Sequence, residues 1–198
     1  MFLARFLRSP RTVGAIAPSS RFLARRMLRG ISLGPAARVV EIGPGTGAFT
    51  GVIRDLMPPG GRYLGIERDA AFVRVLRERW PGLEYVCDSV ENLMRIAGEN
   101  HLLPLDHIIS GLPFASLPPS VTLPILDEIH QSLREGGTFT TFQYLHAYHL
   151  PAARSFRREM ALRFGPLGSW GMVCRNIPPA LVLRWSKGGT APPKAAHP

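Results

Sequence analysis

The 198 residues are 45% hydrophobic and 19% charged, so the chain can form one domain with a full core but is too short for two domains of ordinary size. No uninterrupted apolar run approaches the roughly 20 residues that a membrane-spanning helix needs, and we therefore expect a globular protein. The formal net charge of +10 at pH 7 favours a polyanionic partner, either nucleic acid or an anionic membrane surface, and the charge alone does not choose between them.

Both ends of the chain are purely basic, because no Asp or Glu occurs before Glu41 or after Glu159. Residues 2–8 predict a short amphipathic helix in which arginines flank an apolar face: Phe2, Leu3, Phe6 and Leu7 beside Arg5 and Arg8. Residues 21–29 predict a second helix with Ser20 as its N-cap and four arginines on its polar side. We expect residues 1–30 to face an anionic surface. The alternative is an ordinary helix that packs on a sheet with a solvated arginine face.

The stretch 39–50 organises the rest of the chain. An apolar run contains Glu41, and three glycines follow at alternate positions, Gly43, Gly45 and Gly47. This pattern is typical of a strand, a tight turn and a helix start, with glycine where a Cβ would collide with a ligand or with the chain. It predicts a nucleotide-like cofactor over the turn. On spacing alone, a dinucleotide-binding loop and a plain glycine turn remain alternatives.

From residue 38 the pattern alternates between strands and helices. We expect strands at 38–42, 63–66, 85–87, 107–110 and 138–144, and helices at 47–57, 69–80, 90–97, 121–133 and 152–164. The glycine pair at 136–137 is expected to close the fourth of these helices. Such alternation predicts parallel strands with right-handed crossovers. Two further strands, at 171–177 and 181–185, are expected to form an antiparallel hairpin at the sheet edge.

Polar residues stand where the predicted strands end. The carboxyl ends of parallel strands share one edge of a sheet, and ligands bind there. Glu67 ends the second strand and is placed to accept hydrogen bonds from ribose hydroxyls; the alternative is a surface glutamate paired with Arg68. Asp88 ends the third strand and is either a ligand contact or a helix N-cap.

The glycine stretch with its preceding glutamate resembles the first motif of the class I methyltransferases, which use S-adenosylmethionine. That resemblance implies a Rossmann-like α/β fold with a mostly parallel seven-stranded sheet, an antiparallel edge hairpin and N-terminal amphipathic helices. It also implies that Asp88 meets the adenine amino group of the cofactor. The cofactor-binding residues would be Glu41, Gly43, Gly45, Gly47, Glu67, Asp88, Ser110 and Gly111.

The fourth strand ends in Ser110-Gly111-Leu112-Pro113-Phe114. This segment resembles the Asn-Leu-Pro-Tyr/Phe motif of the rRNA adenine dimethyltransferases. It is more similar to the Ser-Gly-Leu-Pro motif of the bacterial, Rhodobacter-type phospholipid N-methyltransferases, and residues 9–20 resemble the run before the core of those enzymes. Gly111 replaces the asparagine that holds the base amine in the adenine enzymes, which disfavours base methylation.

The resemblance implies stepwise methylation of the amine of phosphatidylethanolamine toward phosphatidylcholine, with S-adenosylhomocysteine as product. The reaction needs a neutral amine, whereas a free primary amine has a pKa of roughly 10. A general base or a dry aromatic site is therefore required. We expect Tyr144 and Tyr148 to hold the amine and His146 or His149 to act as base or phosphate partner; the alternative is a polar loop with two core tyrosines. Other candidates are Phe114 for a pocket wall, and arginines near Ser20 or Arg154 for the lipid phosphate.

The predicted organisation is a membrane-facing segment at 1–30, a cofactor-binding methyltransferase domain at 31–187 and a disordered tail at 188–198. We expect a cytoplasmic protein bound peripherally to the inner face of the cell membrane, with a phospholipid substrate, no metal and no nucleic-acid partner. Cys87 and Cys174 are expected to be free, buried thiols. Two alternatives are an RNA adenine N-methyltransferase whose basic ends hold nucleic acid, and a non-catalytic binding module with the same fold.

Overall fold

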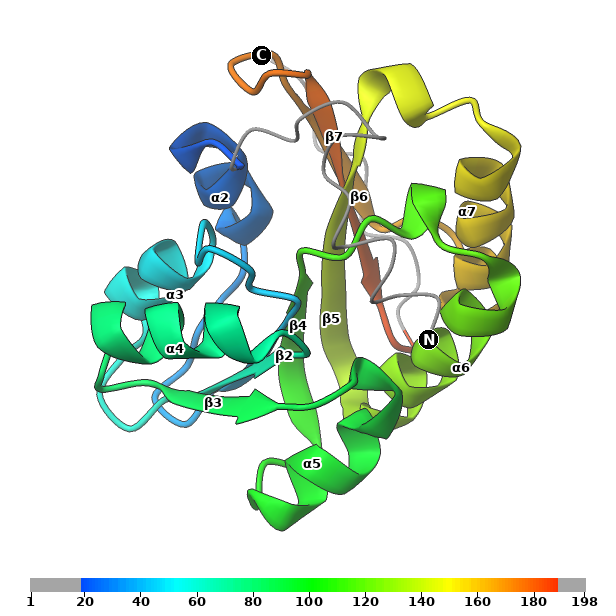
Figure 1. The fold of residues 1–198 in the computed structure, drawn as a ribbon. Coiled ribbons are helices and arrows are strands. Elements are labelled where there is room, and N and C mark those ends of the chain that lie inside the picture. The colour runs from blue at the N-terminus through cyan, green and yellow to red at the C-terminus, as the bar shows by residue number, and fades with distance from the viewer. Residues whose placement is uncertain (1–18, 189–198) are drawn as a thin grey trace.

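A computed structural model describes residues 19–188 as a seven-stranded sheet with helices on both faces (Figure 1). The strand order is β3-β2-β1-β4-β5-β7-β6. Strands β1 to β5 pair in parallel, whereas β7 is antiparallel to both of its neighbours. The predicted Rossmann-like sheet with an antiparallel edge hairpin is confirmed. The strands are β1 (Arg38–Ile42), β2 (Arg62–Glu67), β3 (Glu84–Cys87), β4 (Leu105–Ser110), β5 (Leu133–Tyr144), β6 (Ser169–Val173) and β7 (Ala180–Ser186).

The helices divide between the two faces of the sheet. Helices α2, α3 and α4 cover one face, and α5, α6 and α7 cover the other (Figure 1). Three short 3₁₀ turns connect elements on the way. The helical segments are α2 (Arg21–Leu28), α3 (Thr50–Leu56), α4 (Ala70–Arg79), η1 (Val90–Asn92), α5 (Leu93–Glu99), η2 (Phe114–Ser116), α6 (Pro119–Ser132), η3 (Leu145–Ala147) and α7 (Pro151–Phe164).

The apolar residues of the central strands fill two separate cores. Successive strand residues point to opposite faces, and a parallel strand covered on both faces is apolar throughout. Val40 and Ile42 of β1 therefore pack in the cluster under α5–α7, whereas Val39 packs in the cluster under α2–α4. This double burial fixes β1 firmly at the centre of the sheet, directly before the glycine stretch.

Element boundaries differ from the predictions at two glycine positions and in strand β6, which covers Ser169–Val173 and not 171–177. Helix α3 begins at Thr50 rather than at residue 47, because Gly47 has φ +82° and cannot belong to a right-handed helix. Strand β5 begins at Leu133, directly after α6, so the glycine pair at 136–137 lies inside a strand instead of closing a helix. The pairing of β4 with β5 changes register there, and Gly136 has φ +73°.

Helix α2 packs on the sheet through one apolar side. Ser20 caps it by accepting a hydrogen bond from the Leu23 N–H at 3.2 Å. At the other end, the guanidinium of Arg184 donates to the carbonyls of Met27 and Arg29 at 2.8 and 3.0 Å, which satisfies groups that a helix leaves open. The buried residues are Leu23, Ala24, Met27 and Leu28, and Arg21, Arg25 and Arg29 are exposed. Two predictions lie outside the described residues: the helix at 2–8, with Phe2, Leu3, Arg5, Phe6 and Arg8, and the disordered tail from residue 189 onward.

The two cysteines are free, as expected, but both are exposed. The prediction of buried thiols was wrong for a topological reason. Cys87 ends the edge strand β3 and Cys174 directly follows the opposite edge strand β6, so neither has a neighbouring strand on both sides. Within residues 19–188, no helix is long and apolar enough to cross a membrane.

Candidate functional site

The loop between β1 and α3 combines two tightly packed glycines with one that faces open space. Gly43, Gly45 and Gly47 have φ values of +67°, +56° and +82°, which favour glycine at each position. A Cβ on Gly43 would lie 2.7 Å from a Leu112 side-chain carbon, and one on Gly47 would collide with the ring of Trp80. A Cβ on Gly45 would meet no heavy atom within 4 Å. The loop is therefore anchored at both ends and open at its centre.

Glu67 holds this loop in place. One of its carboxylate oxygens accepts a hydrogen bond from the Gly45 N–H and the other from the Asp69 N–H, both at 2.9 Å. The side chain lies at the carboxyl end of β2 and is only 5% exposed, so it is not the surface partner of Arg68 that the sequence left open. Each carboxylate oxygen has a second lone pair, and Glu67 thus keeps the capacity to accept further hydrogen bonds.

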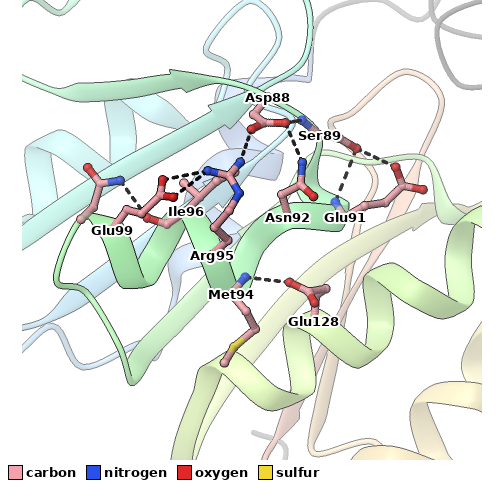
Figure 2. Close-up of polar contacts among 10 residues, drawn as sticks. Asp88, Ser89, Glu91, Asn92, Met94, Arg95, Ile96, Glu99 and Glu128 are labelled. Atoms are coloured by element: carbon pink, nitrogen blue, oxygen red, sulfur yellow. Dashed lines mark hydrogen bonds and ion pairs between the residues drawn. The ribbon is translucent and has the colours of Figure 1, made fainter.

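Asp88 organises the segment after β3 (Figure 2). Its carboxylate accepts hydrogen bonds from the Ser89 N–H, from the Asn92 amide and from the Arg95 guanidinium. The bonds from Asn92, Ser89 and Arg95 lower the pKa of Asp88. These contacts brace the segment that leads into η1 and α5. The N-cap of η1 is Ser89, whose hydroxyl accepts a hydrogen bond from the Glu91 N–H, so the N-cap role that the sequence left open for Asp88 is taken by the next residue. The contact with an adenine amino group stays a prediction.

Ser110 and Gly111 form the end of β4, beside the glycine loop. The Ser110 hydroxyl accepts a hydrogen bond from the Leu112 N–H at 3.1 Å, and the Gly111 N–H donates to the Ile42 carbonyl at 2.9 Å. A Cβ on Gly111 would collide with the carbonyl oxygen of Gly43. Gly111 is thus required by the contact between two backbones, and an asparagine at this position does not fit this pairing of loops.

Glu41 lies beneath the loop and not on its open side. It is fully buried, and one carboxylate oxygen accepts hydrogen bonds from the hydroxyls of Thr50 and Tyr63, both at 2.7 Å. The other oxygen has no partner within residues 19–188. Burial raises the pKa of Glu41 to about 7, and the two hydrogen bonds offset part of that rise. The side chain ties β1 to α3 and β2, and sequence reasoning did not identify either partner.

The segment after β5 separates the four predicted acceptor-site residues into two pairs. Tyr144 stacks on His146 with ring centroids 5.7 Å apart, packs in the cluster under α2–α4, and has a buried hydroxyl without a partner in the described chain. Tyr148 contacts the edge of His149 and packs against the cluster on the opposite face. The two tyrosines therefore pack on opposite sides of the sheet, and a contact of both with one amine stays a prediction.

Three further candidates occupy different environments. Phe114 is 2% exposed and stacks on Phe156 at 4.7 Å, so it belongs to the core and not to an open pocket wall. The N–H of Ser20 donates to the Asn176 side chain at 2.9 Å, which places the start of α2 beside the loop between β6 and β7. Arg154 is exposed near the start of α7.

A groove of about 860 Å³ lies between α2 and α3. Its polar lining is strongly basic, with Asp55 as the acidic residue among the lining residues, and its floor is apolar. The arginines are Arg21, Arg25, Arg26 and Arg29, and the apolar residues include Phe22, Ile31, Leu33, Val52 and Leu56. The described residues contain no group of three or more His, Cys, Asp or Glu side chains placed to hold a metal ion.

The raised pKa of Glu41 predicts a specific dependence of stability on pH. The folded protein retains a proton that the unfolded chain releases above the ordinary pKa of 4.5. The stability that this proton adds to the folded state is therefore fully present below pH 4.5 and is lost as pH rises toward 7. Glu41→Gln keeps the shape and removes the titration. Between pH 5 and pH 7, the free energy of unfolding of the native protein, measured with urea, should fall by roughly 1–3 kcal/mol more than that of Glu41→Gln. The exposed Glu78→Gln is the control, and parallel pH profiles for native protein and Glu41→Gln would contradict this account.

Comparison with known proteins identifies relatives along most of the chain, although no family profile matches. The chain is 33% identical over 183 residues to the ornithine lipid N-methyltransferase of Singulisphaera acidiphila, and the alignment covers 91% of both chains. It is 32% identical over 116 residues to ribosomal RNA small subunit methyltransferase A of Moorella thermoacetica, which covers 52% of this chain and 37% of that protein.

Solved structures share the fold at low sequence identity. A TehB-like S-adenosylmethionine-dependent methyltransferase from Corynebacterium glutamicum has a TM-score of 0.64 at 16% identity, with 94% of this chain and 96% of that chain covered. TrmN from Thermus thermophilus has a TM-score of 0.65 at 15% identity, with 90% and 53% covered. Because the similarity to the lipid enzyme extends along nearly the whole of both chains, this protein belongs to the same family, within the class I methyltransferases that use S-adenosylmethionine.

Proposed function

We propose that this methyltransferase transfers methyl groups to the amine of phosphatidylethanolamine, stepwise toward phosphatidylcholine, at the cytoplasmic surface of a membrane. The observation that carries the proposal is the 33% identity, along 91% of both chains, to an enzyme named for N-methylation of a lipid. The Ser-Gly-Leu-Pro sequence at the end of β4 supports a phospholipid in particular. Ornithine lipid is the second candidate acceptor, because it is the substrate in the name of that relative.

An RNA acceptor is less well supported by the same observations. The ribosomal RNA methyltransferase of Moorella thermoacetica matches only 52% of this chain. At the end of β4, the packing of Gly111 against the Gly43 carbonyl excludes the asparagine that the adenine enzymes use to hold a base amine. The basic groove and chain ends then fit an anionic lipid surface in place of nucleic acid.

The glycine loop and its neighbours suit the cofactor. The space beside Gly45 allows a ligand to approach the backbone closely, and Glu67 is fixed at the adjoining strand end with lone pairs to spare for ribose hydroxyls. Asp88 and Ser110 stand at the next strand ends on either side. When bound, S-adenosylmethionine supplies a methyl group on a sulfonium, which passes to nitrogen as the carbon–sulfur bond breaks and leaves S-adenosylhomocysteine.

The pair Tyr144 and His146 supplies what the acceptor amine needs. The amine must lose a proton before it reacts, and an apolar wall favours its neutral form. Tyr144 and Phe142 contact each other edge to face with ring centroids 5.4 Å apart, and the half-buried ring of Tyr144 offers such a wall. His146 is exposed beside Tyr144 and takes up the proton that the nitrogen releases. As methyl groups accumulate, the fixed positive charge is attracted to the aromatic faces.

Membrane contact is assigned to the arginine face of α2 and to the groove beside it. Each basic residue near an anionic surface contributes about 1 kcal/mol, so the exposed Arg21, Arg25 and Arg29 support reversible attachment. Sedimentation with vesicles that contain anionic lipid measures this contact. Arg25→Gln combined with Arg29→Gln should reduce the bound fraction, and an unchanged bound fraction would refute the assignment.

The acceptor is tested with labelled cofactor and three separate substrates. Purified protein is incubated with vesicles of phosphatidylethanolamine, with vesicles of ornithine lipid, and with total RNA. We expect label in mono-, di- and trimethylated phosphatidylethanolamine. Label in ornithine lipid alone would select the second candidate. Label in RNA with none in either lipid would overturn the proposal.

The cofactor assignment predicts the effect of a side chain on the glycine loop. Gly45→Val places a branched side chain in the open space beside the loop, at a φ of +56° that valine rarely adopts, so affinity for S-adenosylhomocysteine should fall at least about ten-fold. Calorimetry gives the dissociation constant. Gly34→Val is the control, because Gly34 lies away from the loop with open space around it. Normal affinity in Gly45→Val would place the cofactor elsewhere.

The proton-accepting role of His146 predicts a loss in turnover. His146→Asn should lower kcat roughly 10²-fold or more while leaving cofactor affinity intact, since general-base catalysis contributes about that much. His101→Asn is the matched control, because His101 is also exposed but follows α5 and lies away from the strand ends that form the site. Equal kcat values for the two variants in the lipid assay would remove His146 from the mechanism.

A further inference from the structure

The guanidinium of Arg157, on α7, is held in a fixed position by two other parts of the chain. Its carbon atom Cζ lies 3.7 Å from the centre of the Tyr148 ring. Its Nη1 donates a hydrogen bond to the side-chain oxygen of Gln143, on β5, at 2.6 Å. Gln143 is itself 2% exposed, and its amide nitrogen donates to the Ala153 carbonyl at 3.5 Å. A stacked arginine with a buried hydrogen-bond partner loses little further freedom when it binds a ligand.

This guanidinium has no acidic partner within the described part of the chain. Among residues 19–188 no carboxylate lies within ion-pair distance of Arg157, whereas Arg163 on the same helix pairs with both Asp127 and Glu159. The remaining parts of the chain contain no Asp or Glu side chain at all. Burial lowers the pKa of Arg157, and the positive charge of Arg154 acts in the same direction. A partly buried charge without a counter-ion is costly, and a bound anion removes that cost.

Arg157 is also placed next to the acceptor side of the site. Gln143 is the penultimate residue of β5, and Tyr148 follows the strand by four residues. The neighbouring residue on α7, Phe156, stacks on Phe114, which follows the Ser-Gly-Leu-Pro segment at the end of β4. The guanidinium therefore belongs to the region where β4 and β5 end, beside the strand that ends at Tyr144.

We propose that Arg157 binds the anionic group of the lipid headgroup and thereby positions the amine for methylation. This inference rests on the proposed function and names the subsite that would recognise the headgroup. Only one hydrogen bond from the Arg157 guanidinium is found among the described residues, and the fork of remaining N–H groups matches the paired oxygens of a phosphodiester or a carboxylate. Phosphatidylethanolamine offers the former and ornithine lipid the latter.

The same geometry changes the role of Tyr148. One face of its ring is covered by the guanidinium of Arg157, so that face is not available to a methylated ammonium. Tyr148 instead fixes the arginine that holds the anion, and the amine is left to Tyr144 and His146. The anionic and cationic parts of one headgroup would then meet two different residue pairs at the end of β5.

Steady-state kinetics with a matched set of acceptors tests this subsite. The acceptors are vesicles with phosphatidylethanolamine, with ornithine lipid, or with a long-chain alkylamine that has neither phosphate nor carboxylate. Arg157→Gln should raise the KM for the anion-bearing acceptor at least about ten-fold, leave kcat nearly unchanged and leave the alkylamine KM unaffected. Arg157→Lys should recover part of the loss. Arg158→Gln is the control, since Arg158 is exposed on the adjoining position of α7.

The results separate specific recognition from a structural role. An equal rise in KM for all three acceptors, or no change in any KM, would overturn the proposal. A rise in KM for phosphatidylethanolamine alone assigns the site to a phosphodiester, and a rise in KM for ornithine lipid alone assigns it to a carboxylate. Unchanged affinity of Arg157→Gln for S-adenosylhomocysteine shows that the variant is folded.

A binding measurement without turnover keeps this proposal distinct from the proposed function. Calorimetry with S-adenosylhomocysteine present is carried out with glycerophosphoethanolamine and with free ornithine. Native protein should bind at least one of them, and Arg157→Gln should bind neither. If Arg157-dependent binding is found but no lipid amine is methylated, the anion site stands and the proposed function fails. If lipid is methylated but binding does not depend on Arg157, the function stands and the anion site fails.

Discussion

The site depends on the close approach of two backbone segments where β1 and β4 end. The Gly111 N–H donates to the Ile42 carbonyl, and the Gly43 N–H donates to the Ile66 carbonyl on the other neighbouring strand, both at 2.9 Å. No side chain fits between Gly111 and Gly43. Three adjacent strands are thus joined at the point where the strand order reverses, which is the place where open α/β sheets bind ligands. The open space beside Gly45 exists because its neighbours are fixed in this way.

A second layer of contacts supports this arrangement from below. The Glu67 carboxylate accepts a hydrogen bond from the Gly45 N–H. In the interior, the Glu41 carboxylate accepts hydrogen bonds from the hydroxyls of Thr50 and Tyr63. The two glutamates flank the loop but have different environments: Glu67 lies at the strand end and is 5% exposed, whereas Glu41 is fully buried. Burial explains why the pKa of Glu41 rises toward neutrality, and the hydrogen bonds of Glu41 make it a support for the loop.

The arginines of this basic protein serve several different purposes. Arg163 pairs with two carboxylates, and Arg184 satisfies the last carbonyls of α2. Arg157 and the exposed arginines of α2 have no carboxylate partner among the described residues. In this family, the fold is shared with enzymes that act on ribosomal RNA, so the fold alone does not choose the acceptor. Under the proposed function, the acceptor is selected by the loops after β4 and β5 and by the arginines that have no carboxylate partner.

The sequence by itself determined the fold class and the cofactor. The alternation of apolar runs with amphipathic segments gave the order of strands and helices, because buried parallel strands and their covering helices have distinct periodicities. The glutamate and glycine spacing located the loop, because only glycine tolerates those backbone angles. Boundaries failed at residues 47 and 136–137, where a positive φ inside or beside an element depends on packing that the sequence pattern does not express.

Only the tertiary structure decided which side chains share an environment. Tyr144 and Tyr148 are four residues apart in the sequence but pack against opposite faces of the sheet, because β5 ends between them. Phe114, which the sequence suggested for a pocket wall, packs in the core. Arg157 lies over the ring of Tyr148, although nothing in its local sequence indicates this contact. Such pairings are set by contacts between strands and helices distant in the chain, and local periodicity carries no information about them.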